Sequence, residues 1–287
     1  MSGANPWLAR RVIAYAHQGG AYEWPSSTLF AIGKALEAGA TAIELDVHAT
    51  ADGELVVCHD TTVDRTTDGS GPIAELTLAQ LRTLDNAYWF IPGRDVPPGR
   101  PPEEYPLRGR APDDPDLRIA TLREVLERFP RVILNLDIKQ TAPAVAPYED
   151  ALARLLAEYG REDDVIVASF QDVATDRFAA CAPGIATSAG TLATAAFWRA
   201  VQDGVEPPAL RAVAFQVPEQ HAGMAVVDER FVAAAHAAGI AVHVWTVDDE
   251  QSMARLVDLG VDGIISDVPT TLAAVLAARG AGWDPGT

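Results

Sequence analysis

Two histidines and three acids stand where strand-like runs of this sequence end. His17 closes the apolar run 12–16 and is followed by Gln-Gly-Gly, and His59 follows the run 55–58. Glu44 and Asp46 alternate with apolar residues in the run 42–47, so they share one face of a strand. Asp137 has the same setting in "VILNLDIK". Histidines beside clustered carboxylates can perform general acid–base chemistry at a phosphate or a carbonyl.

The strand "VILNLDIK" separates its side chains into an apolar and a polar face. Asn135, Asp137 and Lys139 share one face, and the other face is wholly apolar and must pack against outer helices. Lys139 is one of only two lysines in the chain. The polar face therefore points to an interior, where each unpaired charge would cost several kcal/mol.

The short link between the runs 42–47 and 55–58 brings in the second histidine. It contains Asp-Gly at 52–53, a strong hairpin signal, and is too short for a helix. A two-residue loop there predicts that Asp46 lies opposite His59, with both side chains on one face. His17, at the end of the neighbouring first run, would join them.

Three carboxylates cannot remain ionised side by side without a cation. An all-oxygen cluster favours Mg²⁺ or Ca²⁺ over Zn²⁺, which prefers nitrogen and sulfur. The alternative, a salt-bridge network built on Lys139 alone, leaves an excess of negative charge. Taken alone, His17 fits an ordinary core histidine at least as well, so its functional interpretation depends on these neighbours.

The elements that must position these residues alternate along the chain. Strand-like runs occur at 12–16, 42–47, 55–58, 132–138, 165–170, 185–189, 212–217, 241–247 and 263–266. Helical patterns occupy 28–38, 77–84, 122–128, 148–159, 228–238, 249–259 and 270–279. Setting aside the hairpin partner leaves eight strands, which predicts an α/β fold of the TIM-type (β/α)8 barrel class with an extra hairpin strand and its chemistry at the carboxyl ends of the strands. A doubly wound open sheet is the alternative, but no glycine-rich dinucleotide loop follows the first strand.

One segment breaks this alternation. Residues 86–118 are rich in proline and charge, with Tyr88, Trp89 and Phe90 near their start. We expect residues 1–287 to form a single barrel domain in which this segment is a short insertion over the mouth. A disordered surface loop is the alternative.

Composition limits the possible partners and compartment. The 287 residues carry a net charge of −18 and the sequence pI is about 4.6, so nucleic acid and stable association with an anionic membrane are poor expectations. Cys58 and Cys181 are too few for a disulfide framework, and neither a signal peptide nor a membrane span is evident. The expected location is cytoplasmic, and the oligomeric state is left open.

From about residue 13 to residue 279, the chain resembles the glycerophosphodiester phosphodiesterases. The resemblance rests on "AHQGG", on "GATAIELDVHATADGELVVCHDTTVDRTTDGSG", on "LNLDIK" and on "VHVWTVDDEQSMARLVDLGVDGIISDVP". It implies a TIM barrel that uses a divalent metal to hydrolyse glycerophosphodiesters to glycerol phosphate and an alcohol. It makes His17 and His59 the acid–base pair, Glu44, Asp46 and Asp137 the metal ligands, and Gln18, Arg65, Lys139 and Trp245 substrate-binding residues.

The sequence departs from the family at two neighbouring places. The usual His-Arg-Gly reads His17-Gln18-Gly19, so a phosphate-binding arginine is replaced by a neutral amide. The usual Pro-Glu-Asn-Thr has serine, Ser26, at the acid position. Loss of both charges together indicates that the two residues would otherwise form a pair.

Three functions remain open from the sequence. The first is the metal-dependent phosphodiesterase. The second is a phospholipase-type enzyme acting on lysolipid or phosphoinositol head groups, with the aromatic residues 88–90 as an apolar lip. The third is a barrel that binds a phosphoester without turnover. The alcohol of the substrate, the choice between Mg²⁺ and Ca²⁺, and which histidine is the acid are not determined by the sequence.

Overall fold

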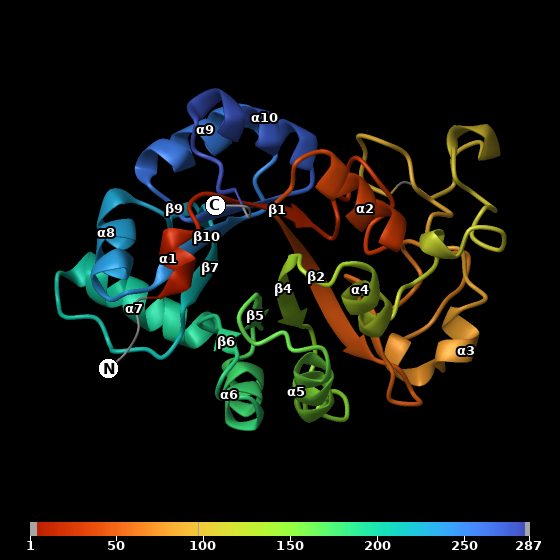
Figure 1. The fold of residues 1–287 in the computed structure, drawn as a ribbon, viewed down its shortest axis with the longest axis horizontal. Helices are drawn as coiled ribbons and strands as arrows, with labels where there is room; N and C mark the ends of the chain where they lie inside the picture. The colour runs from red at the N-terminus through yellow and green to blue at the C-terminus, as the bar shows by residue number, and fades with distance from the viewer. Residues whose placement is uncertain (1–4, 97, 285–287) are drawn as a thin grey trace.

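Eight parallel strands, surrounded by helices, make up the core of the computed structural model, which describes residues 5–96 and 98–284 (Figure 1). The barrel strands are β1 (Ile13–His17), β2 (Ala42–Ala49), β4 (Ile133–Ile138), β5 (Val165–Ala168), β6 (Ala186–Thr187), β7 (Ala214–Pro218), β10 (Ala241–Trp245) and β11 (Gly263–Ser266). Their order is β6-β5-β4-β2-β1-β11-β10-β7. A single bridge, Ser188 to Ala214, links the two ends, so the barrel is nearly closed. The predicted TIM-type barrel is confirmed.

The outer helices cover the apolar faces of the strands. They are α2 (Leu29–Glu37), α4 (Leu122–Arg128), α5 (Glu149–Glu158), α6 (Asp172–Cys181), α7 (Thr191–Asp203), α8 (Glu229–Ala237), α9 (Glu250–Leu259) and α10 (Pro269–Arg279). Side-chain caps define several starts: Thr28 accepts from the N–H of Ala31, and Thr121 forms a capping box with Glu124.

Two of these helices, α6 and α7, are absent from the predicted set. Their apolar faces are thin, which explains the omission. In α7 only Phe197 is fully buried, and in α6 only Ala174, Thr175 and Phe178 are buried. With so few buried positions, apolar residues at helical spacing give little signal.

The short helix α1 (Pro6–Ala9) closes the amino-terminal end of the barrel. Trp7 is buried against Ile13, Tyr15 and other residues of the barrel interior. With this end filled by side chains, the chemistry must lie at the opposite end, where the strands terminate in polar residues.

The extra strand β3 (Leu55–Val57) pairs antiparallel with β2, as expected, but the predicted register was wrong by one residue. Val57 lies opposite Val47, and the N–H of Cys58, not that of His59, reaches Asp46 O at 3.0 Å. The hairpin loop has three residues instead of two, with Gly53 at a φ of +85°. His59 therefore reaches the barrel mouth through the turn after β3, not as a ladder partner of Asp46.

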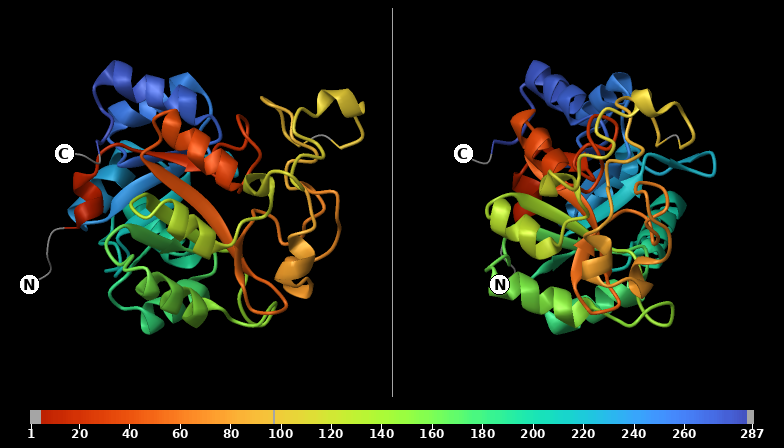
Figure 2. Two further views of the ribbon diagram at one scale, coloured as in Figure 1. Left: turned by 45° about the vertical axis from the view of Figure 1, so that its right-hand side comes forward. Right: turned by 90° about the vertical axis from the view of Figure 1, so that its right-hand side faces the viewer.

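The described residues of the segment 86–118 are irregular and project on the side of the barrel away from α1 (Figure 2, left). It contains the short turns η2 (Pro102–Glu104) and η3 (Pro115–Leu117), and the preceding region holds η1 (Ile73–Glu75) and α3 (Leu78–Leu81). The guanidinium of Arg108 stacks on Tyr88, Trp89 and Tyr105, at 3.9, 4.7 and 5.2 Å from their ring centroids. Tyr88 and Trp89 are thus engaged within the segment and line neither cavity of the barrel mouth, so of the apolar lip predicted at 88–90 only Phe90 lines a cavity, the smaller one.

Within the described residues, no helix has the length and apolarity needed to cross a membrane. Both cysteines are free, Cys58 buried and Cys181 exposed.

Candidate active site at the barrel mouth

His17 is held at the tip of β1 by a tightly packed turn. Gln18, Gly19 and Gly20 have φ values of +54°, +81° and +94°. A Cβ at Gly20 would lie 2.8 Å from Pro269, so this turn against α10 requires glycine. The apolar strand thus ends in a rigid turn that fixes the histidine.

Both histidines are oriented by an aspartate through Nδ1. His17 Nδ1 lies 2.7 Å from Asp267 Oδ1, and His59 Nδ1 lies 2.8 Å from Asp60 Oδ1. The two rings stand edge to face with centroids 5.8 Å apart. When Nδ1–H donates to the aspartate, Nε2 of each ring remains available to accept or donate a proton.

The aspartates have different electrostatic consequences. Burial disfavours the charged form of His17, but the hydrogen bond to Asp267 and the charges of nearby acids outweigh it and raise the pKa of His17 to about 9. Burial alone would raise the pKa of Asp60, but its hydrogen bonds to His59 and Arg65 hold that pKa well below its usual range. Asp60 is therefore ionised and can fix the orientation of the His59 ring.

The three predicted acids meet on neighbouring strands. Glu44 and Asp46 lie on β2 and Asp137 on β4, with Asp46 directly opposite Asp137 in the parallel register. All three are buried. Lys139 Nζ lies 2.8 Å from Asp46 Oδ1 and 3.5 Å from Asp137 Oδ2. The period of two therefore brings the acids and the lysine to one point, as predicted.

The charges of this cluster are unbalanced. Burial, with the charge of Asp46, raises the pKa of Glu44, and burial likewise raises the pKa of Asp137 despite Lys139. Burial opposes the charge of Lys139, but Asp46 and Asp137 outweigh it and raise its pKa. Three carboxylates face the ammonium of Lys139, and His17 Nε2 lies 3.7 Å from Glu44 Oε2, so even with His17 protonated the acids outnumber the positive charges.

The donor set fits a hard divalent cation in type and charge. Asp46 Oδ2 is buried with no hydrogen-bond partner in the described part of the chain. Carboxylate oxygens are the preferred ligands of Mg²⁺ and Ca²⁺, and a divalent ion would balance the excess charge. Among residues 5–96 and 98–284, however, no three His, Cys, Asp or Glu side chains stand arranged as a coordination shell. The ammonium of Lys139 lies between Asp46 and Asp137 instead.

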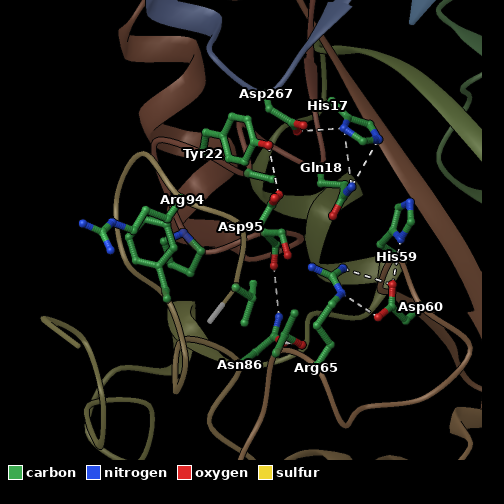
Figure 3. Close-up of a pocket in the computed structure, with 16 residues that line it drawn as sticks. His17, Gln18, Tyr22, His59, Asp60, Arg65, Asn86, Arg94, Asp95 and Asp267 are labelled. Carbon is green, nitrogen blue, oxygen red and sulfur yellow. Dashed lines mark hydrogen bonds and ion pairs between the residues drawn. The ribbon is translucent and has the colours of Figure 1, made fainter. Parts of the chain in front are cut away.

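Two cavities open at the mouth and share His17 and His59. The larger, about 570 Å³, contains the acids, Lys139 and Trp245. On its floor the amides of Asn135 and Gln216 exchange hydrogen bonds of 3.0 and 2.7 Å. The smaller, about 220 Å³, lies under the segment 86–118 (Figure 3).

The smaller cavity contains two of the predicted substrate-binding residues. Gln18 Nε2 lies 3.1 Å from His17 Nε2, and Gln18 Oε1 has no partner in the described structure. Arg65 donates two hydrogen bonds to Asp60, of 2.6 and 3.0 Å, and also lines the smaller cavity (Figure 3). The geometry thus connects Arg65 to the orientation of His59 as well as to the cavity.

Sequence reasoning missed the two orienting aspartates. Asp60 directly follows His59, so proximity along the chain was an available signal. Asp267 is 250 residues from His17 and reaches it only because β11 pairs with β1. A single acid after a strand gives no signal of such a contact.

Comparisons of the sequence and of the fold with known proteins point to one family of phosphodiesterases. Residues 17–271 match the model of the glycerophosphoryl diester phosphodiesterase family. The chain is 31% identical over 264 residues to a glycerophosphodiester phosphodiesterase of Caldanaerobacter subterraneus subsp. tengcongensis, covering 91% of this chain and 96% of that protein. It is 29% identical over 266 residues to a glycerophosphodiester phosphodiesterase of Bacillus subtilis, covering 90% and 84%. The fold is similar to that of an Oleispira antarctica phosphodiesterase solved in complex with the product sn-glycerol-3-phosphate, with a TM-score of 0.71, 24% identity, and 94% and 99% of the two chains covered.

Proposed function

Because this chain belongs to the glycerophosphoryl diester phosphodiesterase family and is therefore a phosphoric diester hydrolase, we propose that it acts through a divalent metal and the pair His17 and His59. The reaction is hydrolysis of a glycerophosphodiester to glycerol phosphate and an alcohol. The product found in the Oleispira phosphodiesterase, sn-glycerol-3-phosphate, is proposed for this chain too. The observation that carries the proposal is the pair of facing histidines, each held by an aspartate, beside three buried acids.

Each histidine carries out one of the two proton transfers of the reaction. With Nδ1–H bound to its aspartate, the neutral ring accepts a proton at Nε2 from the nucleophile, which is water or the glycerol hydroxyl beside the phosphate. The other ring, protonated, donates from Nε2 to the oxygen of the departing alcohol. The ring centroids lie 5.8 Å apart and both rings line the same two cavities, so the two histidines can act on one bound phosphate from the same side.

Glu44, Asp46 and Asp137 would hold the metal, Mg²⁺ or Ca²⁺. When bound, a divalent ion at a phosphodiester neutralises the charge that grows on the phosphoryl oxygens. Lys139, whose pKa is raised by the same acids, stays protonated and adds a second positive charge at that place.

Substrate contacts are proposed for Gln18, Arg65 and Trp245. Gln18 and Arg65 face the smaller cavity beside the histidines, where an amide and a guanidinium can donate to phosphate oxygens. Trp245 lines the larger cavity, 5.5 Å from the ring of Phe170, and supplies an apolar wall. Release of glycerol phosphate from glycerophosphocholine by the purified protein, with and without Mg²⁺ or Ca²⁺, tests the proposal.

Restoring both family charges should show that they act as a pair. Gln18→Arg alone is expected to leave kcat/KM unimproved, since the new guanidinium lacks an acidic partner. Adding Ser26→Glu to that variant should raise kcat/KM. The positions are close: Gln18 and Ser26 line the same cavity, and the N–H of Ser27 donates to Gln18 O at 2.8 Å. A double-mutant cycle in kcat/KM should give a coupling energy of about 0.5–3 kcal/mol. Strict additivity would show that the two side chains do not interact.

A further inference from the structure

A pair of amide side chains spans the barrel beneath the acids, and the proposed chemistry gives it no function. Asn135 Nδ2–H donates to Gln216 Oε1 at 3.0 Å, and Gln216 Nε2–H donates to Asn135 Oδ1 at 2.7 Å. The two residues are 81 positions apart in the chain, Asn135 on β4 and Gln216 on β7. Because branched apolar residues usually fill the interior of this class of barrel, a reciprocal amide pair there needs an explanation.

The pair lies at the boundary between the apolar filling of the barrel and its charged mouth. Side chains two apart on a strand share a face, so β4 presents Ile133, Asn135 and Asp137 to the interior in that order. In the same way β7 presents Ala214 and then Gln216. Ile133 and Ala214 belong to the apolar cluster inside the barrel. The amides therefore form the layer directly beneath an acid that we propose as a metal ligand.

Main-chain pairing holds β7 firmly on one side only. It pairs with β10 along its whole length, but in the described part of the chain only the bridge from Ser188 to Ala214 joins it to β6. Strand β6 itself has two residues. At the mouth, β7 continues into the exposed hairpin of β8 (Gln220–His221) and β9 (Met224–Ala225). The separation of β4 and β7 across the mouth therefore depends on side chains more than on sheet hydrogen bonds.

Small residues on the intervening strands leave room for this contact. Ala168 of β5 and Ser188, which follows β6, line the larger cavity together with the two amides. Neither side chain is long enough to fill the space between β4 and β7. The two amide hydrogen bonds cross that space, and loss of either partner would leave the other amide without its hydrogen bonds.

The amide pair also anchors the strand that carries Asp137. Asn135 lies directly opposite Glu44 in the register of β2 and β4, and Asp137 lies directly opposite Asp46. Lys139 follows on the same face of β4, with its ammonium between Asp46 and Asp137. Because Asn135 is only two residues before Asp137, an anchor at Asn135 limits how far Asp137 can move relative to the other acids.

We propose, on the basis of the proposed metal-dependent function, that Asn135 and Gln216 are positioning residues of the acid cluster. They fix Asp137 relative to Glu44 and Asp46, and they thereby set the affinity of the site for a divalent cation. Neither amide has to touch the cation. Groups that orient metal ligands typically contribute about 10–100-fold to metal affinity.

Two single variants and a swap test the pair. Asn135→Ala and Gln216→Ala should each weaken binding of Mg²⁺ or Ca²⁺ by about tenfold or more, measured as Kd by calorimetry on chelator-treated protein. Gln216→Ala is the decisive variant, because Gln216 is only half-buried and β7 carries none of the three acids. The double variant Asn135→Gln/Gln216→Asn rebuilds a reciprocal pair of the same total length. It should recover most of the lost affinity, which is a coupling that single changes cannot show.

Phe197→Leu controls for a general loosening of β7. The ring of Phe197 lies 4.7 Å from that of Phe215, which is next to Gln216 and packs on the outer side of the strand. This variant should lower Tm without weakening metal binding. In the amide variants, the metal concentration that gives half-maximal activity should rise in parallel with Kd. Saturating metal should restore kcat, because mass action refills a weakened site.

The outcomes separate this inference from the function on which it rests. If the unmodified protein binds the metal and both alanine variants bind it equally tightly, the inference is overturned and the proposed function stands. A swap that binds no better than the single variants, or an equal loss of affinity in Phe197→Leu, also overturns the inference. If the unmodified protein neither binds Mg²⁺ or Ca²⁺ nor hydrolyses glycerophosphocholine, the proposed function fails and the inference fails with it.

Discussion

Replacing either His17 or His59 by alanine should lower kcat by about 10²–10⁴-fold, the usual contribution of one general acid or base. Each histidine has its Nδ1 fixed by a carboxylate, at 2.7 and 2.8 Å, so its function in turnover rests on Nε2. Alanine removes that nitrogen and leaves the strands unchanged. The measurement is steady-state kinetics on glycerophosphocholine at saturating metal, with circular dichroism and a thermal melt to verify the fold.

His236→Ala is the matched control. His236 Nε2 also lies 2.8 Å from an aspartate, Asp262, but this pair stands at the end of the barrel away from the site. The control should lose a histidine–aspartate contact of the same length without a change in kcat. A loss below about fivefold at His17 or His59 would assign that residue to packing instead of catalysis.

Asp137→Ala should abolish metal-dependent activity together with the stabilisation that metal gives the fold. At a metal concentration 100 times Kd, binding should stabilise the unmodified protein by about 2.7 kcal/mol, which raises Tm by roughly 5 °C. In the variant, the ammonium of Lys139 keeps its ion pair with Asp46, which is 2.8 Å long, so removing Asp137 does not leave a buried charge without a partner. The measurement is Tm with chelator and with added Mg²⁺ or Ca²⁺.

Asp176→Ala, at an exposed position of α6, controls for loss of an acid elsewhere. It should keep both the metal-induced rise in Tm and the activity. If Asp137→Ala keeps the full rise in Tm, Asp137 is not a ligand and the charge balance of the cluster has another cause.

The barrel was predictable because its strands are short, β-branched and separated by helical stretches, and because the link at 50–54 is too short for a helix. The hairpin register was not, because the Asp-Gly signal also fits a three-residue loop. In the structure Asp52 accepts from the N–H of Leu78 at 3.0 Å, a tertiary contact that helps to hold the longer loop. One residue of slip then separates His59 from the ladder.

The acids were predictable for a different reason. A period of two puts Glu44, Asp46, Asp137 and Lys139 on interior faces whatever the details of the loops. The contact of His17 with Asp267 depends on the pairing of β1 with β11, which no local sequence pattern predicts. The part of the larger cavity lined by Thr194, Ala195 and Trp198 was not predictable, because it depends on α7, a helix with too few buried apolar residues to be recognised in the sequence.

Hydrolysis of glycerophosphocholine by metal-stripped and metal-reconstituted protein tests the central claim most directly. The products, glycerol phosphate and choline, are quantified after exhaustive chelation and again after Mg²⁺ or Ca²⁺ is restored. The proposed mechanism predicts no turnover without metal and recovery of equimolar products with it. Undiminished turnover in the chelated protein, or none with either ion, would contradict it.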